Sequence, residues 1–359
     1  MPRILVNSFV AARLPATLGQ RVGLVAGLWA LGGLLLAAGG LLWQVFQTGR
    51  PPTIQIAFLL PALVFSGASF GLRAARWHLF LRAAGVRPPI LTSLRTQFIG
   101  FALTLTPGKV GEVYKCYLME RATGAPTART APIVLFEKLM DGAAFSGLAI
   151  IAAAALPGLA DGVSSAARSL IALAAFAAVL GLGLRSWRSS ATQTYLFGAI
   201  RRAPRGPRIA AILETALQGG ADVLRPRLLI VNTTLSFIAR SCDGIAMMWA
   251  AWAAGFSLPP LGGVFVLNSS GALGGFSMLP GGIGVVEAGM SLLLVSLGAS
   301  TGTALVTTLL TRILSFWLWV SIGLGLLMRS TLEPNVATGT KRPLSGVWGS
   351  APTSTEEAG

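Results

Sequence analysis

The sequence predicts an all-α integral membrane protein, a polytopic helical bundle with about six full spans and two re-entrant broken-helix units related as an inverted repeat. Three observations predict this class. The composition is 53% hydrophobic and only 11% charged, and the mean hydropathy is +0.71, which excludes an ordinary soluble domain. Several apolar runs are long enough to cross a bilayer. A proline-glycine motif followed by glutamate also occurs twice, at 106–112 and 279–289.

The charge balance is strongly basic, with 28 Lys and Arg against 12 Asp and Glu. The cations cluster beside apolar segments, where they indicate orientation in the membrane and contact with anionic headgroups at the cytoplasmic face. We therefore expect membrane lipids as partners and no nucleic acid. Cys116 and Cys242 show no metal-ligand spacing, so we expect neither a metal site nor a disulfide framework. No cofactor-binding motif is present.

The N-terminal part predicts two spans that begin and end inside. Residues 1–21 hold three arginines and no acid, so we place them in the cytoplasm, and the apolar runs 22–46 and 54–72 follow as spans. The next segment, 73–95, holds five arginines and no acid, which indicates a return to the cytoplasmic side. Trp77 in this segment is expected to act as an interfacial anchor.

The first broken unit follows. The apolar stretch 91–105 is too short to cross about 30 Å of hydrocarbon, so 91–120 is interpreted as a re-entrant hairpin. A span at 132–155 carries charged residues in its first turns, the loop 156–167 lacks Lys and Arg and is placed outside, and 170–184 returns inward.

The basic loop 185–227 gives the strongest cytoplasmic signal, with eight arginines against two acids. The span 228–254 then crosses outward, and 261–298 forms the second broken unit, in which no Lys or Arg occurs. A last span at 303–328 returns to the cytoplasm. The polar tail 331–359 is expected to be disordered, and both termini are expected to be cytoplasmic.

The two halves show matching features, which predicts a repeat over about 54–155 and about 228–328. Glu112 and Glu137 are 25 residues apart, as are Glu287 and Arg312. Proline and glycine disfavour a continuous helix, so each motif is expected to separate two half-helices. In inverted-repeat transporters, the substrate site lies where such half-helices meet.

Candidate substrate-binding residues lie at the motifs and in the spans. The first motif contributes Pro107, Gly108, Lys109, Gly111 and Glu112, the second contributes Pro280, Gly281, Gly282, Gly284 and Glu287, and the spans contribute Glu137, Lys138, Asp141, Arg240, Asp243 and Arg312. A charge at mid-membrane costs about 3 kcal/mol on translocon scales, so these groups should be paired or face water. Half-helix N-termini and a lysine suit a phosphate.

Particular pairings follow from spacing. Arg240 and Asp243 are three apart on one helical face, and they either line a polar cavity or form a structural ion pair. Glu137 and Asp141 share a face and should repel unless a cation lies between them, for which Arg129 or Lys138 is the candidate. Glu287 is expected to pair with Arg312.

Two further expectations concern the glycines and the charged residues at the breaks. Gly108 and Gly281 are expected to permit a positive φ or a close backbone approach. Lys109 and Glu112 either grip a phosphate or are solvated charges at the interface.

Signals for catalysis are weak, and we assign no catalytic residue. His78 is the only histidine, and no base-orienter pair surrounds it, so it is expected to face headgroups. The G-x-S-x-G match at 67–71 falls in a predicted span and not in a strand-turn-helix, and we treat it as chance.

Four motifs in order resemble those of a known family. They are Arg73-Ala-Ala-Arg76-Trp77, Pro107 to Glu112, Glu137-Lys138 with Asp141, and Leu279 to Glu287 followed by Arg312. This set resembles the lysylphosphatidylglycerol synthase transmembrane region, also called the flippase-like or UPF0104 family. The resemblance implies a lipid flippase-type membrane domain. The best-known members move an aminoacylated phospholipid between leaflets, and others are linked to hopanoid or polyprenyl-linked sugar pathways.

Three functions remain open from the sequence. The preferred one is a lipid translocase of a bacterial inner membrane that moves an amphipathic, anionic or phosphate-bearing lipid and needs no nucleotide. The second is an integral-membrane transferase acting on a lipid phosphate, with Glu112, Glu137 or Glu287 as base. The third is an accessory subunit of a lipid-synthesis complex. A homodimer or a lipid-synthesis enzyme is the candidate protein partner.

Overall fold

A computed structural model describes residues 53–106, 111–156, 225–277 and 279–332, together with the single positions 39, 198 and 202. All regular elements in these residues are helices, in line with the predicted all-α class. The predicted spans 22–46 and 170–184, the segment 1–21, and nearly all of the basic loop 185–227 and of the tail 331–359 lie outside the described residues. So do Pro107, Gly108 and Lys109 of the first motif.

In chain order, the first half consists of a long helix, two short helices and a second long helix. It comprises the turn Ile56–Phe58, α3 (Leu59–Ala83), α4 (Ile90–Ala102), the turn η2 (Leu103–Leu105), α5 (Tyr114–Thr123) and α6 (Thr127–Ala155). The helices α4 and α5 pack against each other, as a hairpin at 91–120 requires. The G-x-S-x-G match lies in the middle of α3, which excludes the nucleophile turn that this motif needs.

The second half has the same order of elements. It comprises α10 (Pro226–Ala253), α11 (Pro260–Phe276), the turn η4 (Pro280–Gly282), α12 (Val285–Ser296), α13 (Thr301–Arg312), the π-helical segment η5 (Ile313–Trp317) and α14 (Leu318–Leu332). The expected interruption at the second motif is therefore present, because α11 and α12 are separate helices on either side of Pro280–Gly282.

Two stretches in the described residues are long and apolar enough to cross a membrane, Ile56–Ala83 and Thr301–Arg329. At 29 and 28 residues, α6 and α10 also exceed the roughly 20 residues that a span requires. Both contain charged residues near their middles. Their hydropathy is therefore interrupted, and the partners of those charges must come from neighbouring helices.

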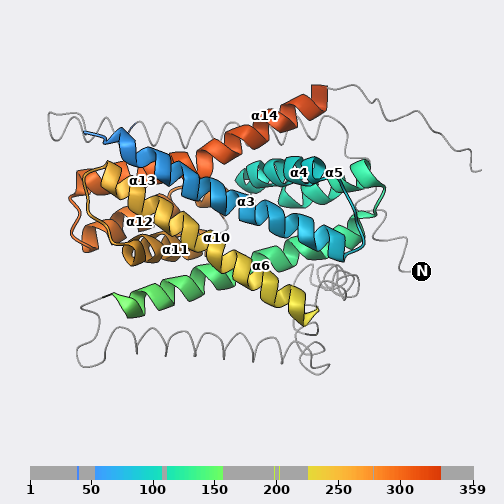
Figure 1. Cartoon of the computed structure of the whole chain (residues 1–359), viewed down its shortest axis with the longest axis horizontal. Helices are drawn as coiled ribbons and strands as arrows, with labels where there is room; N and C mark the ends of the chain where they lie inside the picture. The colour runs from blue at the N-terminus through green and yellow to red at the C-terminus, as the bar shows by residue number, and fades with distance from the viewer. Residues whose placement is uncertain are drawn as a thin grey trace, which may run out of the picture.

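The helices α3 and α10 lie side by side and antiparallel through the centre of the bundle (Figure 1). The start of the first half meets the end of α10, where the Gln55 N–H donates to the Ala253 carbonyl over 2.8 Å. In Figure 1, α4 and α5 lie at one end of this central pair, and α11 and α12 lie at the other. The long helix α6 packs on α11, and α14 packs on α4.

Two expectations about the basic segment 73–95 were wrong. Helix α3 continues through Ala83 instead of ending near residue 72, which buries Arg73 and Arg76. Trp77 is fully buried and is no interfacial anchor. Its indole N–H donates to Thr96 Oγ1 over 3.2 Å, so the polar edge that would suit an interface finds its partner inside the protein.

Candidate functional site

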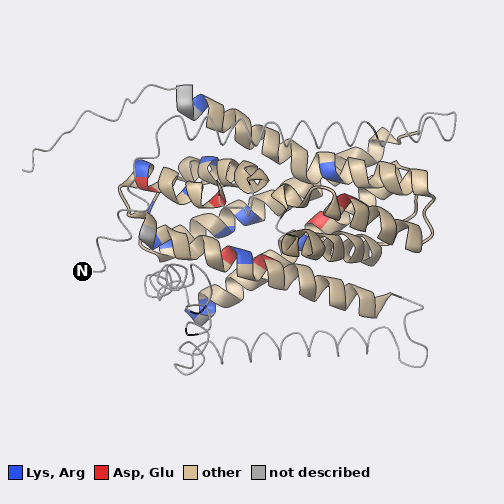
Figure 2. Ribbon diagram, turned by 180° about the vertical axis from the view of Figure 1, so that it is seen from behind, with Lys and Arg blue, Asp and Glu red and all other residues tan. Residues whose placement is uncertain are grey.

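A buried cluster of charges lies where α3, α6 and α10 cross, and Figure 2 shows blue and red segments on the middle turns of these helices. We call this cluster the central charge network. Its members are joined by successive salt bridges, and they are Arg73, Arg76, Lys115, Glu137, Asp141, Arg240 and Asp243.

One end of the network centres on Asp243. Arg73 donates to Asp243 from α3, and its Nη2 also donates to Ser69 Oγ over 2.9 Å. Arg240 Nη1 lies 3.3 Å from Asp243 Oδ2, so the two residues form the ion pair that was one of the two alternatives. This pair is not isolated, because Arg240 Nη2 also reaches Asp141 Oδ2 at 3.2 Å.

The other end centres on Arg76. Its Nη1 lies 2.7 Å from Asp141 Oδ1, and its Nε lies 3.8 Å from Glu137 Oε1. Arg76 is therefore the cation that separates the two carboxylates of α6, and the expectation that Arg129 or Lys138 would do so was wrong. Lys115 completes the chain by donating to Glu137, with its Nζ 3.9 Å from the Trp77 ring centroid.

The network carries an excess of positive charge. Its members among the described residues are four cations and three carboxylates, so its formal charge is +1. The Nε atoms of Arg73, Arg76 and Arg240 are buried and have no hydrogen-bond partner. Burying an uncompensated charge in a membrane is costly. Arg76 Nε faces the equally unpartnered Glu137 Oε1, so the Nε groups of Arg73 and Arg240 are the donors suited to receive one negative charge.

The second motif forms a tight backbone turn with a carboxylate at its centre. Gly281, Gly282 and Gly284 have φ values of 61°, 66° and 86°, which are accessible to glycine without strain. A Cβ at Gly281 would lie 2.8 Å from a ring carbon of Phe316. The expectation that Gly281 permits a positive φ and a close approach is therefore confirmed.

The predicted pairing of Glu287 with Arg312 is also confirmed. Arg312 Nε donates to Glu287 Oε1 over 2.6 Å, and Nη2 donates to the Gly281 carbonyl over 3.1 Å. The other oxygen, Glu287 Oε2, accepts from the Gly284 N–H over 2.7 Å and so caps α12. One arginine thus ties both sides of the break to α13.

The described part of the first motif has a corresponding tie. Glu112 is buried and forms a salt bridge with Lys138 of α6, as Glu287 does with Arg312 of α13. The Gly111 N–H donates to Thr106 Oγ1 over 2.7 Å, and a Cβ at Gly111 would lie 2.8 Å from the Leu103 carbonyl oxygen. This backbone has no room for a side chain.

The two breaks adjoin each other. The turns η2 and η4 are in contact, and Leu105 packs into one apolar cluster with Phe316, Trp317 and Val320, against which Ile283 also packs. The two breaks therefore share one apolar cluster.

The three candidate bases are all paired with cations in the structure. Glu112, Glu137 and Glu287, the three candidate bases, each form a salt bridge with a lysine or arginine. Among the described residues, no group of three or more His, Cys, Asp or Glu side chains is arranged to hold a metal ion.

Comparison with known proteins gives a consistent result. The sequence matches the family described as "Lysylphosphatidylglycerol synthase TM region" over residues 14–323. It is also 26% identical, over 298 residues, to a UPF0104 membrane protein of Pyrococcus horikoshii. That alignment covers 75% of this chain and 86% of the relative. The matched region includes the central charge network and both motifs.

Proposed function

Because the chain belongs to the lysylphosphatidylglycerol synthase TM region family, we propose that it is a lipid translocase of the flippase type. Families of this kind are linked to lipid biosynthesis or translocation, and the chain is a membrane protein that contacts lipids. The proposed substrate is an amphipathic lipid with an anionic or phosphate-bearing headgroup. It moves between the leaflets of a bacterial inner membrane, and both termini of the protein are cytoplasmic.

The observation that carries this proposal is the +1 excess of the central charge network. The cost of moving a lipid headgroup through hydrocarbon is the cost of desolvating its charge. A fixed, buried set of N–H donors with one uncompensated positive charge lowers this cost for an anion. The same set repels a cationic headgroup, so the network also provides discrimination.

The inverted repeat is the second part of the proposal. The order α3, α4, break, α5, α6 recurs as α10, α11, break, α12 and α13 to α14. The corresponding helices α3 and α10 run antiparallel. Contacts between the halves are reciprocal, since α4 packs on α14 while its counterpart α11 packs on α6. These features favour two halves of opposite orientation around a central site.

The motif residues have distinct roles in this proposal. The salt bridges Glu112–Lys138 and Glu287–Arg312 each hold one broken unit against the long helix that follows it. Opening one unit breaks its salt bridge while the other stays closed, which gives access from one side at a time. Gly111, Gly281, Gly282 and Gly284 lie in the turns at which the two units move.

Reconstitution into liposomes tests the function. Purified protein is inserted into vesicles of phosphatidylcholine containing a trace of fluorescent phosphatidylglycerol, and dithionite quenching reports exchange between leaflets. Exchange without any nucleotide or acyl donor supports translocation. Formation of a new lipid product would replace the proposal by the transferase function. If neither exchange nor a new product is observed, the accessory function replaces the proposal.

A further inference from the structure

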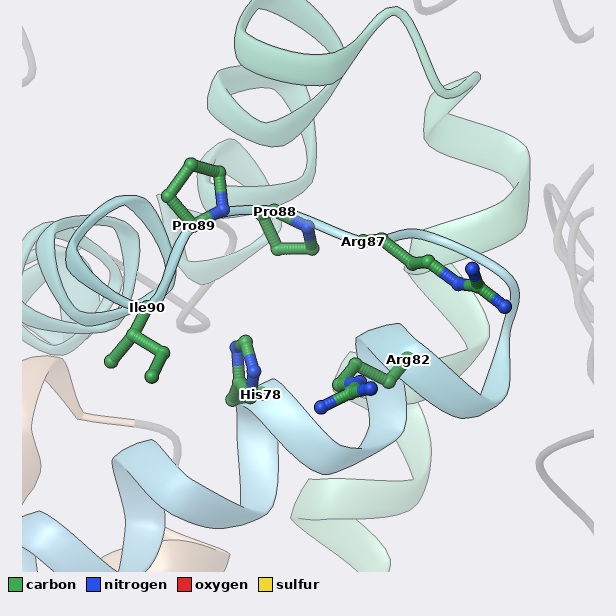
Figure 3. A pocket seen from close by; sticks show the side chains of 6 residues that line it. All are labelled: His78, Arg82, Arg87, Pro88, Pro89 and Ile90. Carbon is green, nitrogen blue, oxygen red and sulfur yellow. The ribbon is translucent and has the colours of Figure 1, made fainter.

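A small basic cavity lies at the C-terminal end of α3. It begins at His78, two residues after Arg76 of the central charge network and on the opposite side of the helix. We call it the basic cavity. Its volume is about 240 Å³, and it is lined by His78, Arg82, Arg87, Pro88, Pro89 and Ile90. Figure 3 shows His78 and Arg82 on α3 facing the two prolines across the opening. No acid lines it, and no described acidic residue pairs with Arg82 or Arg87.

Backbone hydrogen bonds and two prolines constrain the cavity wall. Helix α3 ends in a Schellman turn, in which the Val86 N–H donates to the Leu81 carbonyl and Gly85 has a φ of 77°. The two prolines that follow fix the next part of the wall. His78 Nδ1 is hydrogen-bonded to Ser93 Oγ at 2.8 Å, which holds the ring at the edge of the opening.

The second half of the protein supplies an internal comparison. Helix α10 ends in the same turn, where the Phe256 N–H donates to the Ala251 carbonyl and Gly255 has a φ of 82°. Trp252 stands there in the place of Arg82. Its indole N–H donates to the Leu258 carbonyl over 2.9 Å, so the indole folds onto its own loop. The same backbone turn therefore carries an indole folded over its loop in one half. In the other half it carries Arg82 and Arg87, which pair with no acidic side chain among the described residues.

The size and surroundings of the cavity indicate its ligand. At about 240 Å³ it is smaller than the roughly 300 to 1,000 Å³ of pockets that enclose a whole small molecule. Arginine guanidinium groups match phosphate oxygens with paired N–H donors. Ile90 and Leu91 beside the opening are 74% and 76% exposed, which offers an apolar surface to hydrocarbon chains and not to water.

We propose that the basic cavity binds the phosphodiester headgroup of an anionic phospholipid, with its acyl chains lying on α4 along Ile90 and Leu91. Arg82 holds the phosphate beside the His78 ring, and Arg87 on the adjoining loop adds a second positive charge near the opening. This site is a fixed lipid site and not part of the translocation pathway. It does not depend on the proposed function, because a non-transporting membrane protein would use it equally.

The test counts retained lipids by native mass spectrometry of the full-length protein. The protein is extracted in mild detergent and exposed to equal amounts of phosphatidylglycerol and phosphatidylcholine. Three variants are compared with the wild type: Arg82→Gln with Arg87→Gln, Arg82→Trp, and the matched control Arg227→Gln with Arg329→Gln, which removes two exposed arginines from α10 and α14. Thermal unfolding in lipid-free detergent confirms that each variant is folded.

The expected result is retention of one phosphatidylglycerol by the wild type and the control, with a loss of about tenfold or more in apparent affinity for the double glutamine variant. Arg82→Trp should lose the lipid as well, because it reproduces the closure seen at Trp252. Equal retention by all variants would overturn the proposal. An equal loss of phosphatidylglycerol from the control variant would overturn the proposal too, because general surface charge would then explain the retention. If the protein retains no lipid but binds millimolar inorganic phosphate, the cavity is a free-phosphate site instead.

Discussion

Neutralising Glu287 alone should destabilise the protein more than neutralising Glu287 and Arg312 together. Glu287→Gln keeps the shape of the side chain and an acceptor oxygen, but it removes the carboxylate charge that pairs with Arg312. Removing the arginine at the same time leaves no charge stranded. The two single variants and the double variant therefore form a double-mutant cycle.

The exposure of the two side chains determines how much unfolding free energy each single change costs. Breaking a fully buried pair costs about 3–5 kcal/mol. The Arg312 side chain is 8% exposed, but that of Glu287 is 28% exposed, so water reaches the carboxylate and the lower end applies. We expect Glu287→Gln to cost about 3 kcal/mol. Arg312→Gln should cost about 2 kcal/mol, because Glu287 keeps the Gly284 N–H.

The double variant loses only the net contribution of the salt bridge to the unfolding free energy, which we place at about 2 kcal/mol. The coupling energy in the cycle is then about 3 kcal/mol, far above the roughly 0.5 kcal/mol expected for independent sites. The assay is equilibrium unfolding in mixed micelles titrated with dodecyl sulfate, followed by tryptophan fluorescence. Additive effects of the two single changes would refute the pairing, and Gly275→Ala, which meets no atom within 4 Å, serves as the neutral control.

Three further predictions follow from the backbone and the topology. Gly281→Ala, at φ 61° and against a phenyl ring, should cost about 1–3 kcal/mol of unfolding free energy and abolish leaflet exchange; unchanged exchange would show that the turn is not part of the transport cycle. Gly323→Ala would place a methyl group 2.2 Å from a backbone carbonyl oxygen of α4, whereas Gly325→Ala on the same helix meets nothing within 4 Å. Unfolding assays should therefore show a loss of more than about 2 kcal/mol for the first and less than about 0.5 kcal/mol for the second. Single cysteines at Arg205 and Asp161 should react with an impermeant maleimide only from the cytoplasmic and only from the outer side, respectively, and external labelling at Arg205 would contradict the topology.

The second motif was predictable because its geometry is local. Proline and glycine dictate a break whatever surrounds them, and a carboxylate inside an otherwise apolar segment requires a cation. Arg312 was the one basic residue available in the neighbouring span. The sequence therefore predicted both the turn at Gly281 and the Glu287–Arg312 pair.

Three of the seven members of the central charge network, Arg73, Arg76 and Lys115, were missing from the candidate site residues, and for the two arginines the reason is physical. Arg73 and Arg76 follow an apolar run, and the sequence does not distinguish a span that ends before them from one that continues through them. Their partners lie 170 and 65 residues away, so no local spacing reveals the pairing. One signal was available: Ser69, Arg73 and Arg76 lie on one helical face, which indicates a polar stripe on a buried helix and not a solvated end.

The central claim is that the excess positive charge of the network binds the anionic headgroup during translocation. Measuring leaflet exchange in variants of Arg73 and Asp243 tests this claim most directly. Arg73→Gln makes the network neutral, and Arg73→Gln with Asp243→Asn restores the excess of one. The account predicts that the single change slows exchange of phosphatidylglycerol by about tenfold or more, equivalent to about 1.4 kcal/mol, and that the double change recovers most of it. Undiminished exchange in folded Arg73→Gln protein would contradict the claim.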